Sequence, residues 1–246
     1  MEGVEATGGA LSVVGLRTGY GRLQVVNGLD LQIGPGETLG LLGPNGHGKS
    51  TALRTIAGVH PAEAGSVMLD GANVTNWGAE RVAAAGLTLI PQGSALFSQL
   101  TVRECLLIAG RLPRAKSGRE RSLDQVHSLF PRLLERRSQL VGTLSGGERQ
   151  MVAIGMGIMS NPRVLILDEP TLGLSPAMRS EICRTLVEYK GEGPAMIIAD
   201  GDLDFLFALV DRWQFVELGK TRASGDSSDR PSDVIVKEMY FGDSHV

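Results

Sequence analysis

The chain has 246 residues, of which 42% are hydrophobic and 21% are charged, a composition that fits one or two compact units with a buried core and excludes a disordered chain. Its formal net charge is −3, so no overall basic field draws it to nucleic acid or to anionic lipid, and we expect no nucleic-acid partner. The two cysteines, Cys105 and Cys183, lie far apart in helix-like apolar patterns, which predicts reduced core thiols rather than a disulfide framework or a zinc site.

The N-terminal stretch MEGVEATGGA is acidic and rich in glycine, unlike a signal peptide or a transit peptide. We therefore expect residues 1–10 to form a disordered tail. No apolar run approaches the ~20 residues that a membrane-spanning helix needs. These features predict a cytoplasmic protein without direct membrane insertion, which reaches a membrane only through a partner.

Strands of two kinds are predicted along the chain. Residues 11–33 and 66–74 alternate between apolar and polar positions, which predicts a small antiparallel β-subdomain. Four short runs are apolar throughout and end at Gly, Pro or acidic residues, as the strands of a buried parallel sheet do. These runs are residues 38–42, 87–91, 164–168 and 195–199.

Helical patterns follow several of the apolar runs, notably at residues 49–58 and Pro176–Lys190, which indicates an α/β fold. The stretch 93–162 is mostly helical and rich in arginine, without a further buried-strand run. We interpret it as a helical subdomain inserted into a core made of residues 11–92 and 163–246. Near the C-terminus, the polar residues 219–233 are expected to form turns that lead to a last short helix ending near Tyr240.

The stretch GPNGHGKST, residues 43–51, follows one apolar run directly and precedes a helical pattern. It fits the phosphate-binding pattern G-x-x-x-x-G-K-[ST], in which backbone N–H groups at a helix N-terminus form a concave anion site. Lys49 is expected to reach the β- and γ-phosphates, and the Ser50 hydroxyl to bind Mg²⁺. The strand and helix around the loop argue against a plain Gly-rich turn. The predicted nucleotide ligands are Gly43, Asn45, Gly46, Gly48, Lys49, Ser50 and Thr51.

The stretch RVLILDEP, residues 163–170, is an apolar strand that ends in two acidic residues. Such a pair lies at the carboxyl edge of a parallel sheet, where open α/β folds bind their ligands. Asp168 is suited to hold hydrated Mg²⁺, which is usually bound by one or two carboxylates. Glu169 is the predicted catalytic base, because it can orient or deprotonate the attacking water. Two solvated strand-end carboxylates are the alternative, and the phosphate loop argues against it.

In the stretch TLSGGERQMVAIG, residues 143–155, Ser145, Gly146 and Gly147 stand just before a helical run. They offer a hydroxyl and backbone N–H groups at a positive helix end, which makes a second anion site. Together with GPNGHGKST and RVLILDEP, in that order, LSGGERQ resembles the ATP-binding subunit of ATP-binding cassette (ABC) transporters over about residues 11–242. The resemblance implies a P-loop ATPase core with an antiparallel β-subdomain and an inserted helical subdomain, and ATP with Mg²⁺ as its ligands.

In the ABC family the second anion site contacts the γ-phosphate held by the opposite subunit. The resemblance therefore implies a head-to-tail dimer with another cassette, identical or paralogous, with two ATP molecules between the chains. It also implies integral membrane permease subunits as partners. Within this stretch Ser145 and Glu148 have the spacing of a helix capping box, S-x-x-E, and capping is compatible with phosphate binding by residues 145–148.

Two further positions carry over from the family. Gln92, in LIPQGSALFSQLTVREC, follows a strand, and the resemblance gives it a role at Mg²⁺ and in sensing the γ-phosphate. Tyr20, in TGYGRLQVV, is expected to stack on adenine through its ring face. An ordinary strand aromatic is the alternative for Tyr20.

Within the family the sequence is most similar to the smaller ATP-binding subunit of branched-chain amino acid importers, the LivF type. The similarity extends through residues 74–104 and 128–176 and includes the ending MYFG. Related importers of urea and short amides have similar subunits. The resemblance therefore implies uptake of branched-chain amino acids or related small polar solutes, by a subunit that is peripheral on the inner face of the cell membrane.

The sequence departs from the common ABC pattern at three places. Gly201 occupies the position of a histidine that, in most family members, bridges the γ-phosphate and the water, and glycine can do neither. Ser175 and Pro176 replace a frequent Leu-Asp pair. His47 stands in the phosphate loop where a small residue is usual, and we expect it to point to solvent.

Three function classes remain open. The first is an ATP-hydrolysing motor subunit that drives a membrane permease, favoured by Lys49, Asp168 and Glu169. The second is an ATP-dependent dimerisation clamp with feeble hydrolysis of its own, paired with a related cassette and favoured by Gly201. The third is a non-transport ABC ATPase of the kind found in translation or DNA repair, which ordinarily carries tandem cassettes or zinc modules that this sequence lacks.

Overall fold

The computed structural model describes residues 10–93, 96–191 and 193–230. Residues 1–9 of the expected tail and the short helix expected near Tyr240 lie outside this part. Ala10, the last residue of the expected tail, is buried. In the described residues no helix is both long and apolar enough to cross a membrane.

A six-stranded sheet forms the centre of the protein, with the strand order β10-β9-β3-β8-β7-β6. Strands β9, β3, β8, β7 and β6 are parallel to one another, and only β10 pairs antiparallel, with β9. Every residue of β3, β7 and β8 is buried, which confirms three of the four apolar runs as inner strands. The fourth run forms β6 at the edge of the sheet, where two of its four residues are only half-buried. The strands are β3 (Thr38–Leu42), β6 (Leu87–Ile90), β7 (Val164–Asp168), β8 (Ala195–Ala199), β9 (Arg212–Glu217) and β10 (Lys220–Asp226).

The prediction of turns throughout residues 219–233 was wrong, because Lys220–Asp226 form strand β10. This strand lies at the edge of the sheet and alternates between exposed and half-buried residues, so its residues can be polar. The turn Leu218–Gly219 joins it to β9, with φ angles of 48° and 73°, as a tight hairpin of two residues requires.

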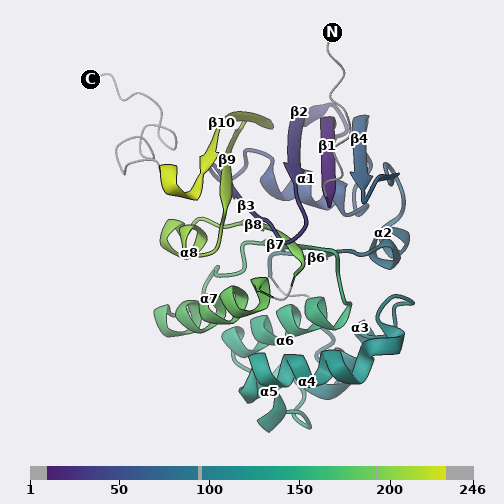
Figure 1. Ribbon diagram of the computed structural model, residues 1–246, viewed down its shortest axis with the longest axis vertical. Helices are drawn as coiled ribbons and strands as arrows, with labels where there is room; N and C mark the ends of the chain where they lie inside the picture. The colour runs from purple at the N-terminus through teal and green to yellow at the C-terminus, as the bar shows by residue number, and fades with distance from the viewer. Residues whose placement is uncertain (1–9, 94–95, 192, 231–246) are drawn as a thin grey trace.

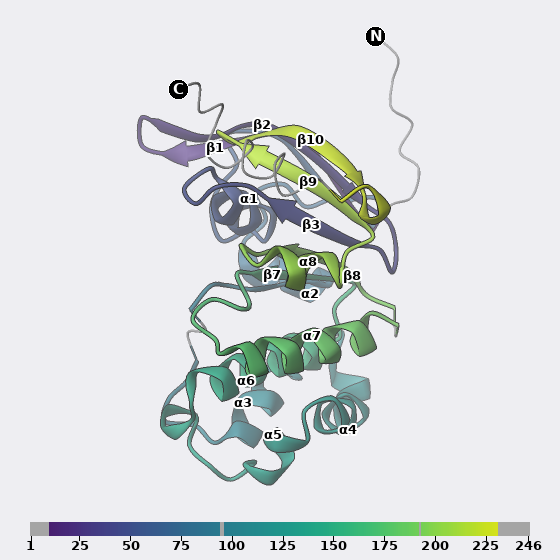
Figure 2. The same cartoon turned by 90° about the vertical axis from the view of Figure 1, so that its left-hand side faces the viewer.

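A second sheet is antiparallel, as expected, with the strand order β2-β1-β4-β5. Helix α1 (Lys49–Ile56) lies between the two sheets (Figure 2). Its Ala52, Leu53 and Ile56 share one buried apolar cluster with Leu11 and Leu39 from the two sheets. The strands are β1 (Leu11–Tyr20), β2 (Leu23–Ile33), β4 (Ala64–Leu69) and β5 (Ala72–Asn73).

Most of the other helices gather on the other side of the six-stranded sheet (Figure 1), whereas Val82 of the short helix at residues 79–85 belongs to the apolar cluster of α1. Between β6 and β7 the described residues form helices and turns, with one isolated bridge between Thr101 and Leu140. The helices of this segment are α3 (Val102–Ala109), α4 (Arg119–Leu129), α5 (Pro131–Glu135) and α6 (Gly146–Met159). The other α-helices are α2 (Ala79–Ala85), α7 (Pro176–Lys190) and α8 (Leu203–Phe207).

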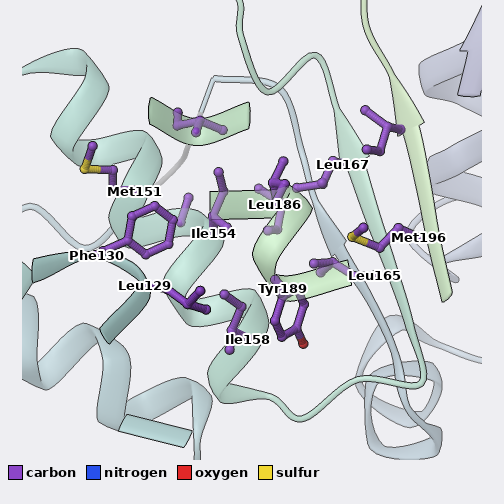
Figure 3. Close-up of a cluster of buried hydrophobic side chains, with 14 of the residues drawn as sticks. Leu129, Phe130, Met151, Ile154, Ile158, Leu165, Leu167, Leu186, Tyr189 and Met196 are labelled. Carbon is purple, nitrogen blue, oxygen red and sulfur yellow. The ribbon is translucent and has the colours of Figure 1, made fainter. Parts of the chain in front are cut away.

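One apolar cluster joins the helices to the sheet. Figure 3 shows Phe130, from the junction of α4 and α5, with Ile154 and Leu186 of α6 and α7 on one side of this cluster. Leu165 and Met196 of β7 and β8 lie on the other side. Because α6 and α7 pack here, the segments that precede them are fixed relative to the carboxyl ends of the strands.

Candidate functional site

The phosphate loop connects β3 to α1, as the sequence predicts. Gly43 and Gly48 have φ angles of 139° and 96°, in the region that side chains disfavour. A Cβ on Gly43 would stand 2.1 Å from the carbonyl oxygen of Val216, so only glycine fits there. The loop therefore turns within a confined space, and the N-terminus of α1 opens toward the edge of the sheet.

Lys49 lies in the first turn of α1 and is almost fully buried. Its Nζ donates to the carbonyl oxygens of Gly43 and of Pro44, the latter at 3.0 Å. Burial lowers the pKa of Lys49, whereas the charges of Glu169, Asp168 and Asp200 act to raise it. The ammonium group thus lies at the loop, close to three carboxylates, where a phosphate can replace the carbonyl contacts.

Ser50 and Asp168 bring the two predicted halves of the site together. Ser50 Oγ donates to Asp168 Oδ1 at 2.9 Å, although 118 positions separate them in the sequence. The other oxygen, Oδ2, is buried and has no hydrogen-bond partner among the described residues. Burial is the main cause that raises the pKa of Asp168, and the bond from Ser50 opposes it.

These groups fit a magnesium ion bound with a nucleotide. A buried carboxylate oxygen without a partner is costly, and a cation beside it removes that cost. Mg²⁺ prefers oxygen ligands and is usually bound by one or two carboxylates together with phosphates and waters. Ser50 Oγ and Asp168 are therefore two groups of this chain that could hold the ion, and Gln92 lines the same cavity.

Glu169 follows Asp168 at the end of β7 and has an unusual backbone, with a φ of 50°. Its N–H donates to the carbonyl oxygen of Ala199 at the end of β8, at 2.7 Å. Gln92 Nε2 donates to Glu169 Oε2 at 2.6 Å. Burial, and next the charge of Asp168, raises the pKa of Glu169, while Lys49 acts to lower it. A half-buried carboxylate with a raised pKa is suited to accept a proton from water.

Two cavities meet at Glu169. One, of about 330 Å³, is lined by phosphate-loop residues together with Gln92 and Glu169. The other, of about 590 Å³, is lined by the loops after β7 and β8 and includes Gly201. Asn45, Glu169 and Leu172 line both cavities. The structure thus places Asn45, Gly46, Gly48, Lys49, Ser50, Thr51, Gln92 and Glu169 around one space.

Gly201 lies in the loop after β8 and is exposed. No described heavy atom lies within 4 Å of the position that a Cβ would take there. A side chain at position 201 would therefore enter open space at the wall of the larger cavity.

The two acidic residues beside Gly201, Asp200 and Asp202, both accept hydrogen bonds from other loops or helices. Asp200 is almost fully buried, and burial raises its pKa. Its Oδ2 accepts from the N–H of Thr171 at 3.0 Å. The carboxylate of Asp202 caps α8 by accepting from the N–H of Phe205 and pairs with Arg179. Asp200 was not among the predicted site residues, although it directly follows β8 and Asp168 ends β7.

Tyr20 lies at the end of β1 with 47% of its surface exposed. Its ring stands 4.6 Å from that of His60, tilted by 37°. Among the described residues that line the two cavities, Tyr20 is absent. The ring is accessible as a stacking surface, but it stands apart from the space around Glu169.

Residues 145–148 begin α6 and do not line either cavity in the described part of the chain. Ser145 and Glu148 form the predicted capping box, and Glu148 also pairs with Arg136 at 2.8 Å. Gly147 packs against Met178 of α7, because a Cβ on it would meet Met178 Cε at 2.5 Å. Within one chain, the predicted second anion site is thus separate from the phosphate loop.

His47 differs from the expectation that it points to solvent. It is half-buried, its Nδ1 accepts from the N–H of Leu218 at 3.4 Å, and its carbonyl oxygen accepts from the N–H of Gly219 at 3.0 Å. The reason is strand β10, which the sequence did not predict and whose hairpin turn covers this side of the loop.

The sequence and the fold of this chain resemble those of known proteins. Residues 26–172 match the sequence profile of a family described as ABC transporter. The chain is 34% identical to the high-affinity branched-chain amino acid transport ATP-binding protein BraG of Pseudomonas aeruginosa, over 94% of this chain and 99% of that protein. It is also 34% identical to the Nod factor export ATP-binding protein I of Paraburkholderia xenovorans, over 91% of this chain and 72% of that one.

Solved structures agree with the sequence comparisons. An ATP-binding cassette of an ABC transporter in its ADP conformation matches with a TM-score of 0.81 and 25% identity, over 95% of this chain and 98% of that one. A nucleotide-free ATP-binding cassette matches with a TM-score of 0.77 and 25% identity, over 88% and 91% of the two chains. Because the family profile covers more than half of the chain and its relatives span nearly all of it, the protein belongs to the ABC transporter family, among the ATP-binding cassettes.

Proposed function

We propose that this chain is the ATP-binding and ATP-hydrolysing subunit of an importer, and that it powers the uptake of branched-chain amino acids or related small polar solutes through a membrane permease. The observation that carries the catalytic part is the contact between Ser50 and Asp168, which joins a phosphate loop to an acidic strand end. The class of solute is supported by the likeness to BraG over 94% of the chain.

In this proposal each group of site residues has a separate role in binding or hydrolysing ATP. Lys49 and the N–H groups of the phosphate loop bind the phosphates of ATP, and Ser50, Asp168 and Gln92 hold Mg²⁺. When bound, the ion would supply positive charge that offsets the negative charge developing on the phosphates. Glu169 orients the attacking water and takes its proton. The closed walls around Lys49 strengthen these electrostatic contacts, because little water screens them.

The remaining predicted site residues contact either the ATP bound by the same subunit or the ATP bound by the other subunit of a dimer. Tyr20 stacks on adenine. Residues 145–148 of one subunit face the γ-phosphate held by the other, in a head-to-tail pair of cassettes that is either homomeric or formed with a paralogue. Their separation from the phosphate loop within one chain is consistent with this arrangement.

Residues 11–92 and 163–246 act as the ATPase core with its β-subdomain, and residues 93–162 act as the helical subdomain that carries the second anion site. The permease subunits hold the assembly at the inner face of the cell membrane, as a peripheral protein. ABC cassettes of transporters generally act with such membrane subunits.

Steady-state ATP hydrolysis by the purified chain, alone and with its permeases in liposomes, tests the proposal. We expect hydrolysis that needs Mg²⁺ and ATP-driven uptake of leucine, isoleucine or valine in the assembled transporter. Hydrolysis without uptake of any of these solutes or of a related amide would remove the solute class and keep the ATPase.

Open space at Gly201 favours a second candidate, an ATP-dependent clamp that closes with a related cassette and hydrolyses feebly itself. The two candidates differ in turnover. A mixed dimer in which only this chain carries Glu169→Gln keeps most of its activity if the chain is a clamp, and loses a large part of it if the chain is a motor.

A further inference from the structure

We propose that Arg179 is a positioning residue for ATP hydrolysis, because it closes a ring of hydrogen bonds that holds the loop carrying Glu169 against the loop at Gly201. The inference rests on the proposed hydrolysis of ATP at this site. Arg179 lies in the first turns of α7, at the wall of the cavity of about 590 Å³ that Glu169 and Gly201 also line.

The first half of the ring joins Thr171 to Asp200. Thr171 follows Glu169 by two positions and is buried, and its N–H and Oγ1 both donate to the carboxylate of Asp200, at 3.0 and 2.8 Å. Asp200 Oδ1 also accepts from the N–H of Asp202, at 2.8 Å. A single buried carboxylate therefore binds the loop after β7 and the loop after β8.

The second half of the ring joins Arg179 to Asp202 and to Leu174. The Arg179 guanidinium donates to Asp202 Oδ2 at 2.6 Å through one nitrogen and to the carbonyl oxygen of Leu174 at 3.2 Å through Nε. The N–H of Leu174 in turn donates to the carbonyl oxygen of Thr171 at 3.1 Å. The contacts thus run from Thr171 through Asp200, Asp202, Arg179 and Leu174 back to Thr171.

The ring surrounds a strained position. Glu169 has a φ of 50°, which costs free energy for a residue other than glycine and persists only where the surroundings enforce it. Its N–H is held by Ala199 at 2.7 Å, directly before Asp200. A loop that can relax at Thr171 or Leu174 would let Glu169 leave this conformation and would move its carboxylate.

The exposure of the ion pair argues for positioning rather than for stability. The side chains of Arg179 and Asp202 are 39% and 24% exposed, and ion pairs this open to water add little to stability. Arginine is suited to the task, because its planar fork donates in two fixed directions at once. Figure 2 shows α8, which Asp202 caps, beside α7, so both partners stand on packed elements.

The test compares Arg179→Gln with Arg179→Lys and with Arg184→Gln in the full-length protein. Arg184 lies on the same helix and is exposed, and no hydrogen bond or ion pair joins it to either loop within the described part of the chain, so it is the matched control. We expect Arg179→Gln to lower kcat for ATP about 10-fold, since a small misplacement of a reacting group is costly, with KM for ATP within about two-fold. Arg179→Lys, which keeps the charge but not the fork, recovers part of the loss.

A kcat for Arg179→Gln within two-fold of wild type overturns the proposal, and so does an equal loss in Arg184→Gln. A lower kcat accompanied by an equal rise in KM, or by unfolding at the assay temperature, assigns Arg179 a structural role instead. A wild-type chain that hydrolyses no ATP, alone or assembled, removes the proposed function together with this inference, whereas an active wild type with an equally active Arg179→Gln removes the inference alone.

Hydrogen exchange of the nucleotide-free protein examines the ring itself. We expect the amides of residues 171–174 and 200–203 to exchange faster in Arg179→Gln than in wild type, and at the wild-type rate in Arg184→Gln. Unchanged exchange in both segments of Arg179→Gln contradicts the ring even if kcat falls.

Discussion

Gln92 Nε2 donates to Glu169 Oε2 at 2.6 Å. The two residues follow β6 and β7, which are neighbouring parallel strands, so the register of the sheet brings their side chains to the same edge. The carboxylate that we propose as the general base is therefore engaged by an amide. The bond engages Oε2, and the carboxylate keeps other lone pairs that can accept a proton from water.

Replacing this amide by a carboxylate changes the pH dependence. In Gln92→Glu a second negative charge stands beside Glu169, whose pKa burial and Asp168 already raise. A like charge raises it further. Because the general base acts in its deprotonated form, we expect the acid limb of the pH profile of kcat/KM to move to higher pH. Gln92→Ala, which adds no charge, is the control, and identical acid limbs for the two variants would contradict the assignment.

Glu169→Gln keeps the shape of the side chain and removes its basicity. We expect ATP hydrolysis to fall about 100-fold or more, as the loss of a general base typically produces, while ATP binding persists. The variant should accumulate as an ATP-bound dimer, detectable by size-exclusion chromatography with light scattering. Glu188→Gln, at an exposed position of α7, should behave as wild type. Turnover of Glu169→Gln at the wild-type rate in the assembled transporter would refute the assignment.

Lys49→Ala removes the buried ammonium group of the phosphate loop. Because its charge lies in a poorly hydrated site beside the loop carbonyls, we expect nucleotide binding to disappear in calorimetric titrations with ATP. The fold should remain, since α1 is held by Ala52, Leu53 and Ile56. Lys116→Ala, at an exposed position of the helical segment, serves as the control, and tight ATP binding by Lys49→Ala would show that the phosphates lie elsewhere.

Gly201→His adds an imidazole where the chain leaves room. No described atom approaches the position of the new Cβ within 4 Å, so we expect normal folding and an unchanged Tm. The ring can then donate toward a phosphate at the wall that Glu169 lines. Turnover should rise several-fold over wild type and over Gly201→Ala. A Gly201→His variant that hydrolyses ATP no faster than Gly201→Ala would mean that the glycine does not limit the rate.

Glu148 stabilises the start of α6. Burial acts to raise its pKa, but the bonds from Ser145 and the charges of Arg136 and Arg132 outweigh it, so the pKa lies below the usual value. A lowered acid pKa contributes stability above the unfolded pKa of about 4.3, and this contribution is lost as pH falls through the folded value.

We therefore expect Glu148→Ala to lower the free energy of unfolding by about 1 kcal/mol at pH 7, as the loss of a helix cap does. This corresponds to about 2–4 °C in Tm. The difference from wild type in thermal melts should shrink below about pH 4. Glu135→Ala, an exposed residue of α5, should change neither melt. A difference that persists unchanged in acid would show that charge is not involved.

Much of the nucleotide site could be predicted because its parts obey local rules. The stretches TLGLL and VLILD are buried strands, and the groups that follow a parallel strand meet at one edge of the sheet. Ser50 and Asp168 were both predicted to hold Mg²⁺, and they lie 2.9 Å apart although β8 separates β3 from β7.

The features that could not be predicted from the sequence depend on contacts between residues that lie far apart in the chain. Strand β10 is polar because it is an edge strand, so its composition looks like a loop. The contacts of Arg179 with Asp202 and of Asp200 with Thr171 join side chains whose types alone indicate only solvated charges or helix caps. The burial of Asp200 is what distinguishes it, and burial requires the packed sheet.

The hairpin turn Leu218–Gly219 lies against the phosphate loop, with its N–H groups directed at His47 and with Leu218 also accepting from Asn27. One edge of the nucleotide site is thus assembled from a segment some 170 positions downstream in the sequence. A recombinant hybrid that takes its N-terminal half from this cassette and its C-terminal half from a relative would pair a histidine with a foreign turn. Grafting between such proteins should therefore exchange the loop and the hairpin as a unit.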